Sequence, residues 1–179
     1  VVAQTEPKLA FLSAQTAPHW PDIRLPTLGL DDFKETVEGL TPLGEEPAAA
    51  RDDIAELMFT SGTTGEPKGV VLSHGNLVSN VMASRQVLPV RPRYRMLSLL
   101  PLSHMLEQTG GLLVPLYSGA SIVYPVSRQP SIIFKTMQKN RVTNLVVVPQ
   151  ALQLFMNAIE REVKARGKER QWRLLSRLA

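Results

Sequence analysis

The feature that most constrains this chain is a run of small and hydroxyl-bearing residues between two apolar segments. Residues 59–69 read FTSGTTGEPKG, with three glycines, four hydroxyl side chains and one lysine. Such a run is unsuited to the interior of a packed helix or strand, because glycine costs conformational entropy there and offers no side chain to pack. It therefore predicts a loop that joins two ordered elements.

The composition of this loop suits it to binding a polyphosphate. Glycine lets backbone N–H groups converge on one point and lets an anion approach closely. The hydroxyl side chains add hydrogen-bond donors, and Lys68 adds a mobile positive charge. We interpret the loop as a phosphate cradle, with an ordinary flexible hairpin loop as the alternative.

This loop does not fit the Walker A pattern. A Walker A loop has the spacing G-x-x-x-x-G-K-[ST], and a helix starts at its lysine. Here Gly62 and Gly65 are three residues apart, Lys68 follows after two more, and the next residue is Gly69. The residues that come after, Val-Val-Leu at 70–72, favour a strand, so we expect no helix dipole to hold the phosphate.

Bulk composition narrows the class of protein. The chain has 179 residues, of which 44% are hydrophobic, enough for a packed core. It has no cysteine and three scattered histidines, which excludes disulfides and thiolate sites and gives no basis for a zinc site. We predict no metal site built by the protein alone. The lack of cysteine and of a signal peptide favours a cytoplasmic location.

The positive charge lies at one end of the sequence. The chain has a net charge of +4, and residues 160–179 account for all of it with seven Lys or Arg and three Glu. We favour a solvated helix face there, with an anionic partner as the alternative. Neither a DNA-binding motif nor the aromatic interleaving of an RNA binder is present, so nucleic acid is not an expected partner.

Apolar runs and amphipathic segments alternate along the chain. We predict strands at residues 9–12, 23–28, 56–60, 70–72, 95–100, 121–124 and 144–148, and helices at residues 33–40, 77–87, 103–116, 131–140, 150–166 and 168–178. This alternation indicates an α/β fold, with a parallel or mixed β-sheet covered by helices. We expect residues 1–53 to form leading strands, a short helix and a linker, and residues 54–179 to form an α/β subdomain. The apolar stretch 96–125 is interrupted by prolines, glycines and charge, so we interpret it as core and not as a membrane span.

Residues 59–69 closely resemble the phosphate-binding signature of the adenylate-forming superfamily, which includes acyl-CoA synthetases, peptide-synthetase adenylation domains and luciferases. The resemblance continues through VVLSHGNL at 70–77, LPLSHMLEQ at 100–108, SGASIVY at 118–124 and TNLVVVPQALQLF at 143–155. The His-x-x-Glu form of LPLSHMLEQ is similar to long-chain fatty acyl-CoA synthetases. The resemblance covers most of residues 54–160.

The resemblance implies roles for these motifs. The loop would bind the β and γ phosphates of ATP and shield the departing pyrophosphate, whose charge Lys68 would neutralise. His104 would lie near the substrate carboxylate and the acyl tunnel. The implied catalytic residues are Lys68 and His104, and the implied substrate-binding residues are His104 and Glu107. The implied ATP-binding residues are Thr60, Ser61, Gly62, Thr63, Thr64, Gly65, Lys68 and Gly69. Mg²⁺ would arrive with ATP, and coenzyme A would be the co-substrate of a carboxylic acid, which the His-x-x-Glu form favours as a fatty acid.

Two features of the helix predicted after Pro101 have open interpretations. Glu107 lies three residues after His104 on one helix face, where it would either fix the tautomer of His104 or pair with a base elsewhere. Gly110 and Gly111 each cost roughly 1 kcal/mol in a helix relative to alanine. A close neighbour should compensate, and we favour a packed helix over an acyl chain. We interpret as core the residues Met105, Leu112, Leu113 and Leu116.

Some motifs of the superfamily have no counterpart in residues 1–179. We find no Tyr-Gly-x-Thr-Glu or Thr-Gly-Asp segment and no C-terminal domain with its hinge and lysine. We therefore expect an internal piece of a large N-terminal domain, inactive in isolation, whose exposed sheet edges and apolar faces favour a homodimer.

Three functions follow from these expectations. The first is a piece of an AMP-forming ligase that makes fatty acyl-CoA. The others are an adenylation domain that loads a carrier protein, and a non-catalytic nucleotide-binding or interaction module. The resemblance leaves open the acyl chain length and an association of the longer protein with a membrane surface.

Overall fold

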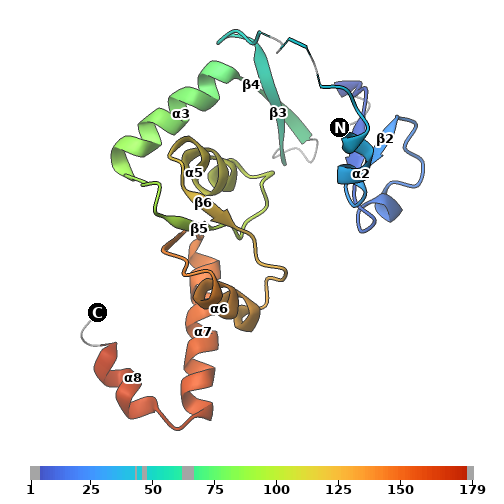
Figure 1. The fold of residues 1–179 in the computed structure, drawn as a ribbon. Coiled ribbons are helices and arrows are strands. Elements are labelled where there is room, and N and C mark those ends of the chain that lie inside the picture. Colours follow the sequence, from blue (N-terminus) through green and yellow to red (C-terminus); the bar gives the residue numbers. More distant parts are fainter. Residues whose placement is uncertain (1–4, 43, 46–47, 62–66, 177–179) are drawn as a thin grey trace. The chain divides into compact units, whose positions relative to one another are not determined.

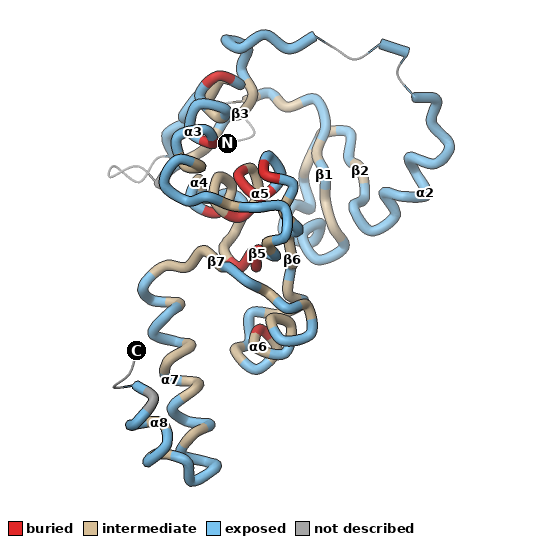
Figure 2. The backbone as a smooth tube through the Cα atoms, turned by 60° about the vertical axis from the view of Figure 1, so that its left-hand side comes forward, coloured by how far each residue is buried: buried red, intermediate tan, exposed pale blue. Residues whose placement is uncertain are grey.

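The computed structural model describes residues 5–42, 44–45, 48–61 and 67–176. Contacts divide the chain into two compact units, Val1–Val71 and Leu72–Ala179, whose elements are labelled in Figure 1. Every residue that is buried among those described belongs to the second unit, as the red segments of Figure 2 show. The expected division at residue 53 concerns a longer protein and stays a prediction.

The first unit opens with two parallel strands and a short helix. Its first elements are β1 (Ala10–Leu12), the 3₁₀ turn η1 (Ala17–His19), β2 (Thr27–Gly29) and α2 (Phe33–Glu38). In the β1–β2 pair, Phe11 lies opposite Leu28. The Phe11 and Phe33 rings lie 6.3 Å apart in a tilted arrangement. This aromatic contact holds α2 against the strand pair.

Two longer strands flank the glycine-rich run. They are β3 (Ile54–Ser61) and β4 (Pro67–Ser73), which pair with each other. Because a parallel pair needs a connection of about a dozen residues or more, strands joined by such a short segment form an antiparallel hairpin. The sequence predicted strands on both sides of the loop, and the structure confirms both.

The second unit is built on a three-stranded parallel sheet with the order β6-β5-β7. Its elements are α3 (His74–Val87), β5 (Arg95–Leu97), α4 (Met105–Glu107), η2 (Gln108–Leu113), α5 (Val114–Tyr117), β6 (Ser121–Val123), α6 (Pro130–Lys139), β7 (Asn144–Leu145), α7 (Pro149–Ala165) and α8 (Glu169–Leu175). The central strand, β5, pairs with Ile122 of β6 and with Asn144 of β7 at the same residue, Met96. The predicted α/β class with a parallel sheet is confirmed.

Helices cover both faces of this sheet. Leu97 is fully buried and packs with Leu99 and with Ile133 of α6, and Phe155 of α7 borders the same cluster. Met96, the residue before Leu97, points to the opposite face because side chains alternate along a strand. In both views α5 and α6 lie on opposite sides of β5 (Figures 1 and 2). The result is a layered arrangement of helices around one sheet.

The helix predicted at residues 103–116 is present but not regular. It starts with α4, widens into the π-helix η2 over Gln108–Leu113, and ends as α5. In a π-helix each N–H bonds a carbonyl five residues back, and such turns occur often at functional sites. The predicted strands at 95–100 and 144–148 are shorter in the structure, ending at Leu97 and Leu145. No helix of the described residues is both long and apolar enough to cross a membrane.

A capping box fixes the start of α3, three residues earlier than the sequence predicts. The Ser73 hydroxyl accepts a hydrogen bond from the Asn76 N–H at 3.2 Å, and the Ser73 N–H donates to Asn76 Oδ1 at 3.0 Å. These reciprocal bonds satisfy backbone donors that the first turn leaves unpaired. The second unit therefore begins with a well-defined helix start.

We expect Ser73→Ala to lower the free energy of unfolding by about 0.5–2 kcal/mol, because the cap would lose its side-chain acceptor. Urea unfolding followed by circular dichroism measures this. Ser131→Ala is the matched control, since the exposed Ser131 hydroxyl has no hydrogen-bond partner among the described residues. An equal loss in both variants would contradict the capping argument.

Candidate functional site

The residues of the proposed phosphate loop are described only in part. Thr60 and Ser61 end β3, and Lys68 and Gly69 lie in β4. Gly62, Thr63, Thr64 and Gly65 lie outside the described residues. Thr60, Lys68 and Gly69 are all exposed, and Lys68 forms no ion pair with any described residue. The lysine charge is therefore available to an anion.

The hairpin geometry separates this loop from a P-loop. β4 begins at Pro67, and the first helix after Lys68 starts at His74. The expected strand after the lysine is confirmed, and no helix starts at Lys68 as it would in a P-loop. A Cβ on Gly69 would lie 3.4 Å from Cε1 of Phe59, so the first strand packs closely against the second at the base of the loop.

His104 and Glu107 occupy very different surroundings in the second unit. His104 is exposed at the N-cap of α4, whereas Glu107 in the same helix is 0% exposed. The carbonyl oxygen of His104 accepts the N–H of Glu107 at 3.0 Å. Neither carboxylate oxygen of Glu107 has a hydrogen-bond partner among the described residues. The structure therefore does not form the side-chain pair that a shared helix face suggested.

The burial of Glu107 is costly. An acceptor that is buried without a partner costs about 1–3 kcal/mol, and a charged one costs more. Native proteins usually keep such groups only for a reason, such as function or a bound partner. Glu107 is thus the most conspicuous polar group of the second unit.

The two adjacent glycines are explained by close packing, although the closest atoms do not belong to the expected helix. A Cβ on Gly110 would lie 3.1 Å from Cγ2 of Val146, which follows β7. A Cβ on Gly111 would overlap the carboxylate of Glu107, with Cδ at 2.6 Å. The close neighbour of Gly110 is therefore Val146, which follows β7, and that of Gly111 is Glu107 of its own helical segment. The expected helix neighbour is present, because α3 packs against η2 and Asn80 bonds Thr109 beside Gly110, but it does not supply the closest atoms.

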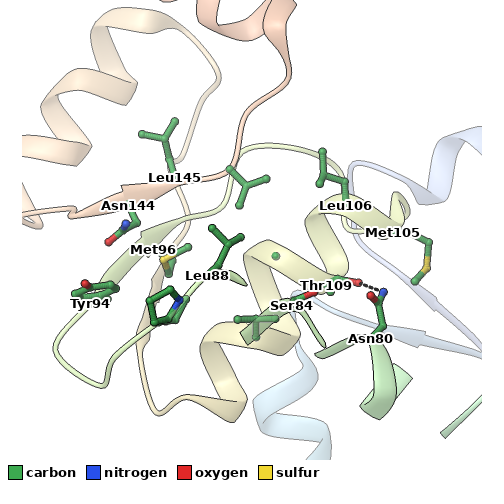
Figure 3. Close-up of a pocket in the computed structure, with 15 residues that line it drawn as sticks. Asn80, Ser84, Leu88, Tyr94, Met96, Met105, Leu106, Thr109, Asn144 and Leu145 are labelled. Atoms are coloured by element: carbon green, nitrogen blue, oxygen red, sulfur yellow. Dashed lines mark hydrogen bonds between the residues drawn. The ribbon is translucent and has the colours of Figure 1, made fainter. Parts of the chain in front are cut away.

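A mainly apolar cavity of about 500 Å³ lies within the second unit (Figure 3). Volumes of this size are typical of small-molecule sites. Asn80 and Thr109 contribute polar atoms to its wall and are joined by a hydrogen bond of 3.2 Å, from Asn80 Nδ2 to Thr109 Oγ1. The remaining lining residues are Ser84, Leu88, Pro89, Val90, Tyr94, Met96, Met105, Leu106, Gly110, Val114, Asn144, Leu145 and Val146.

The cavity corrects the interpretation of the helix 105–117. Met105 lines the cavity and is only half-buried, so it is not simply core. Leu116 is 59% exposed and is not core at all. Local sequence carried no signal for the cavity, because its lining comes from segments between residues 80 and 146 that only the tertiary fold brings together.

The cavity lies beside the strands and not only beyond their carboxyl ends. Its lining includes Met96 of β5 and both residues of β7, Asn144 and Leu145, together with residues that precede β5 in the chain. His104, which follows β5, does not line it. Lys68 and Gly69 belong to the first unit and His104 to the second. Among the described residues no cluster of three metal-ligating side chains forms.

Comparison with known proteins assigns the chain to a family. The family model of the AMP-binding enzymes matches residues 2–178. The long-chain-fatty-acid–CoA ligase 1 of Saccharomyces cerevisiae is 43% identical over 107 residues, which cover 58% of this chain and 15% of that protein. The chloroplastic long-chain-fatty-acid–[acyl-carrier-protein] ligase AEE15 of Arabidopsis thaliana is 30% identical over 125 residues, covering 70% of this chain and 17% of that protein.

A solved structure agrees with these relatives. The ATP-bound MatB from Rhodopseudomonas palustris superposes with a TM-score of 0.72 at 26% identity, covering 86% of this chain and 32% of that one. The chain thus spans less than a third of the length of each protein compared here. Because the family model matches nearly the whole chain, this chain belongs to the AMP-binding enzymes, the adenylate-forming ligases that its sequence resembles.

Proposed function

We propose that this chain is part of an ATP-dependent ligase that activates a fatty acid and transfers its acyl group to coenzyme A. One observation carries the proposal. The run FTSGTTGEPKG begins in β3 and ends in β4, two strands that pair with each other, inside a chain that the AMP-binding family matches over residues 2–178. The activity belongs to the whole protein of which these residues are a part.

The reaction has two steps that share one acyl-adenylate. A carboxylate oxygen attacks the α-phosphorus of ATP, the bond from that phosphorus to the bridging oxygen breaks, and pyrophosphate leaves. The thiol of coenzyme A then attacks the acyl carbon, loses its proton and displaces AMP. ATP enters as its magnesium complex, so the metal ion is part of the substrate.

In this proposal the hairpin loop binds the phosphates that depart. The hydroxyls of Thr60 and Ser61 and the backbone N–H groups of the loop donate to the β and γ phosphates. Lys68 is exposed, and no described acidic side chain competes for its charge. Placing this cation beside the leaving pyrophosphate stabilises charge that grows as the bond breaks.

The second unit supplies the acyl site. The turn that begins at His104 also carries Met105 and Leu106, which line the apolar cavity. We assign the contact with the substrate carboxylate to His104, because Glu107 is fully buried. The hydrocarbon part of the acid fills the cavity, where apolar burial of each methylene contributes about 0.8 kcal/mol.

The acceptor of the acyl group has two candidates. One compared relative is named for coenzyme A and the other for acyl carrier protein, and both are named for long-chain fatty acids. We favour coenzyme A because the His-x-x-Glu form of residues 104–107 is similar to long-chain acyl-CoA synthetases. A non-catalytic module that kept the loop is the remaining alternative.

We further propose that the whole protein is cytoplasmic and that it contacts a membrane surface. We also propose that residues 1–179 dimerise when they are isolated.

The first test removes the cation of the loop. In the whole protein, we expect Lys68→Ala to lower carboxylate-dependent exchange of labelled pyrophosphate into ATP by about 10²-fold or more, as for loss of one group that stabilises the transition state. Lys34→Ala is the control, since the Lys34 side chain is 82% exposed and its ion pair among the described residues is with Glu38 of its own helix. A binding module without catalysis would show no exchange in either protein.

The second test identifies the substrate class. We expect exchange with fatty acids, with kcat/KM rising about fourfold per added methylene until the cavity is full. The same acids are then offered with coenzyme A or with acyl carrier protein as acceptor. Exchange only with amino or aryl acids would retain the adenylation chemistry but overturn the fatty-acid assignment.

The third test uses residues 1–179 alone. We expect weak binding of inorganic triphosphate at most and no acyl-CoA formation, because several motifs of the family are missing from these residues. Calorimetry with triphosphate and a thioester assay measure both properties. Robust acyl-CoA formation by this chain would show that the missing motifs are not needed.

A further inference from the structure

In the second unit, the carboxyl group of Glu107 occupies the space that a side chain on residue 111 would need. A Cβ on residue 111 would overlap Oε1 of Glu107 and would lie 2.6 Å from its Cδ. Among the described glycines, the next closest contact is that of Gly110 with Val146, at 3.1 Å. Glycine at position 111 is therefore what allows the carboxyl group to lie where it does.

Shape, and not hydrogen bonding, holds Glu107 in this space. The side chain is 0% exposed, and neither of its oxygens has a partner among the described residues. Residues four apart on a helix are neighbours on its surface. The carboxyl group of Glu107 thus fills the position that a side chain at residue 111 would otherwise take.

This pair lies inside the segment that forms one wall of the cavity. Met105 and Leu106 come before Glu107, and Thr109 and Gly110 lie between the two members of the pair; all four line the cavity. Glu107 and Gly111 do not line it. The carbonyl oxygen of His104, at the start of the same segment, accepts hydrogen bonds from the backbone N–H groups of Glu107 and Gln108, both at 3.0 Å.

We propose that Glu107 and Gly111 are a positioning pair, in which the buried carboxyl group sets the path of residues 104–111 and with it the cavity wall. The inference rests on the proposed ligase function, because the residues it positions are those assigned to the carboxylic acid. A side chain added at residue 111 displaces the carboxyl group of Glu107 and, with it, the cavity wall formed by this segment. The displaced wall no longer fits the acyl chain of the acid. The phosphate loop is not part of this segment, so binding of ATP is unaffected.

The test is a double-mutant cycle in the whole protein with five variants: G111A, E107A, E107A/G111A, E107Q and G39A. Pyrophosphate exchange gives KM for the fatty acid and for ATP, and calorimetry gives the melting temperature. We expect G111A to raise KM for the acid at least about fivefold and to leave KM for ATP within about twofold. In the E107A background the same substitution should change KM for the acid less than about twofold, because the space is already vacant.

Two further variants separate shape from charge and from glycine loss in general. E107Q keeps the size of the side chain, so it should raise KM for the acid clearly less than E107A does, and E107A should raise it at least about fivefold. G39A is the matched control, because a Cβ on Gly39 meets nothing within 4 Å and the residue has φ −88°. It should leave both KM values unchanged.

Several outcomes would overturn the proposal. One is an equal effect of G111A in both backgrounds, and another is an unchanged KM for the acid. A loss in E107Q as large as in E107A would mean that charge, and not shape, is what matters at this position. If G111A does not fold, the contrast between E107A and E107Q decides.

The experiment distinguishes an error in the proposed ligase function from an error in the proposed role of Glu107 and Gly111. Absence of exchange with any acid in the unmodified protein overturns the ligase proposal and the positioning role with it. The melting temperatures then still report the shared space, since the drop caused by G111A should vanish in the E107A background. A drop of the same size in both backgrounds would show that the two residues do not share it.

Discussion

The second unit depends on the central strand β5. Its neighbours pair with it on both sides, at Met96 and Leu97, and the side chain of Leu97 is completely buried. Successive side chains of this strand serve opposite faces, so Leu97 anchors the cluster with α6 while Met96 lines the cavity. The chain that leaves β5 carries His104. One short apolar strand thus fixes the core, the cavity and the turn of the proposed acyl site together.

The first unit is organised differently. None of its described residues is buried, and large apolar side chains such as Phe11 and Ile54 are more than half exposed. The hairpin that carries the proposed phosphate loop therefore receives little packing from its own unit. Since apolar burial is the main favourable contribution to folding, and since the chain spans less than a third of the length of the compared relatives, the proposed ligase activity is a proposal about the whole protein and not about these residues alone.

The helical segment 105–117 shows how a local rule fails where chemistry is concentrated. A regular helix would place residues three apart on one face, so the sequence left open whether Glu107 contacts His104 or pairs with a base elsewhere. In the structure His104 caps the helix and faces solvent, while Glu107 turns inward to the space beside Gly111. A wider π-helical turn follows at once. Two glycines, a costly buried acid and an irregular turn are one connected feature.

The sequence by itself determined the order of the elements and the family. Alternation of apolar runs and amphipathic segments depends on neighbours in the chain, so strands on both sides of the loop and the helices after them were predictable within a few residues. The eleven residues at 59–69 were specific enough to indicate the family. The tertiary structure alone decided the cavity, the exposure of Leu116 and the burial of Glu107. Each of these is set by contacts between segments distant in sequence or by the space left around a side chain, and local periodicity contains no information on either.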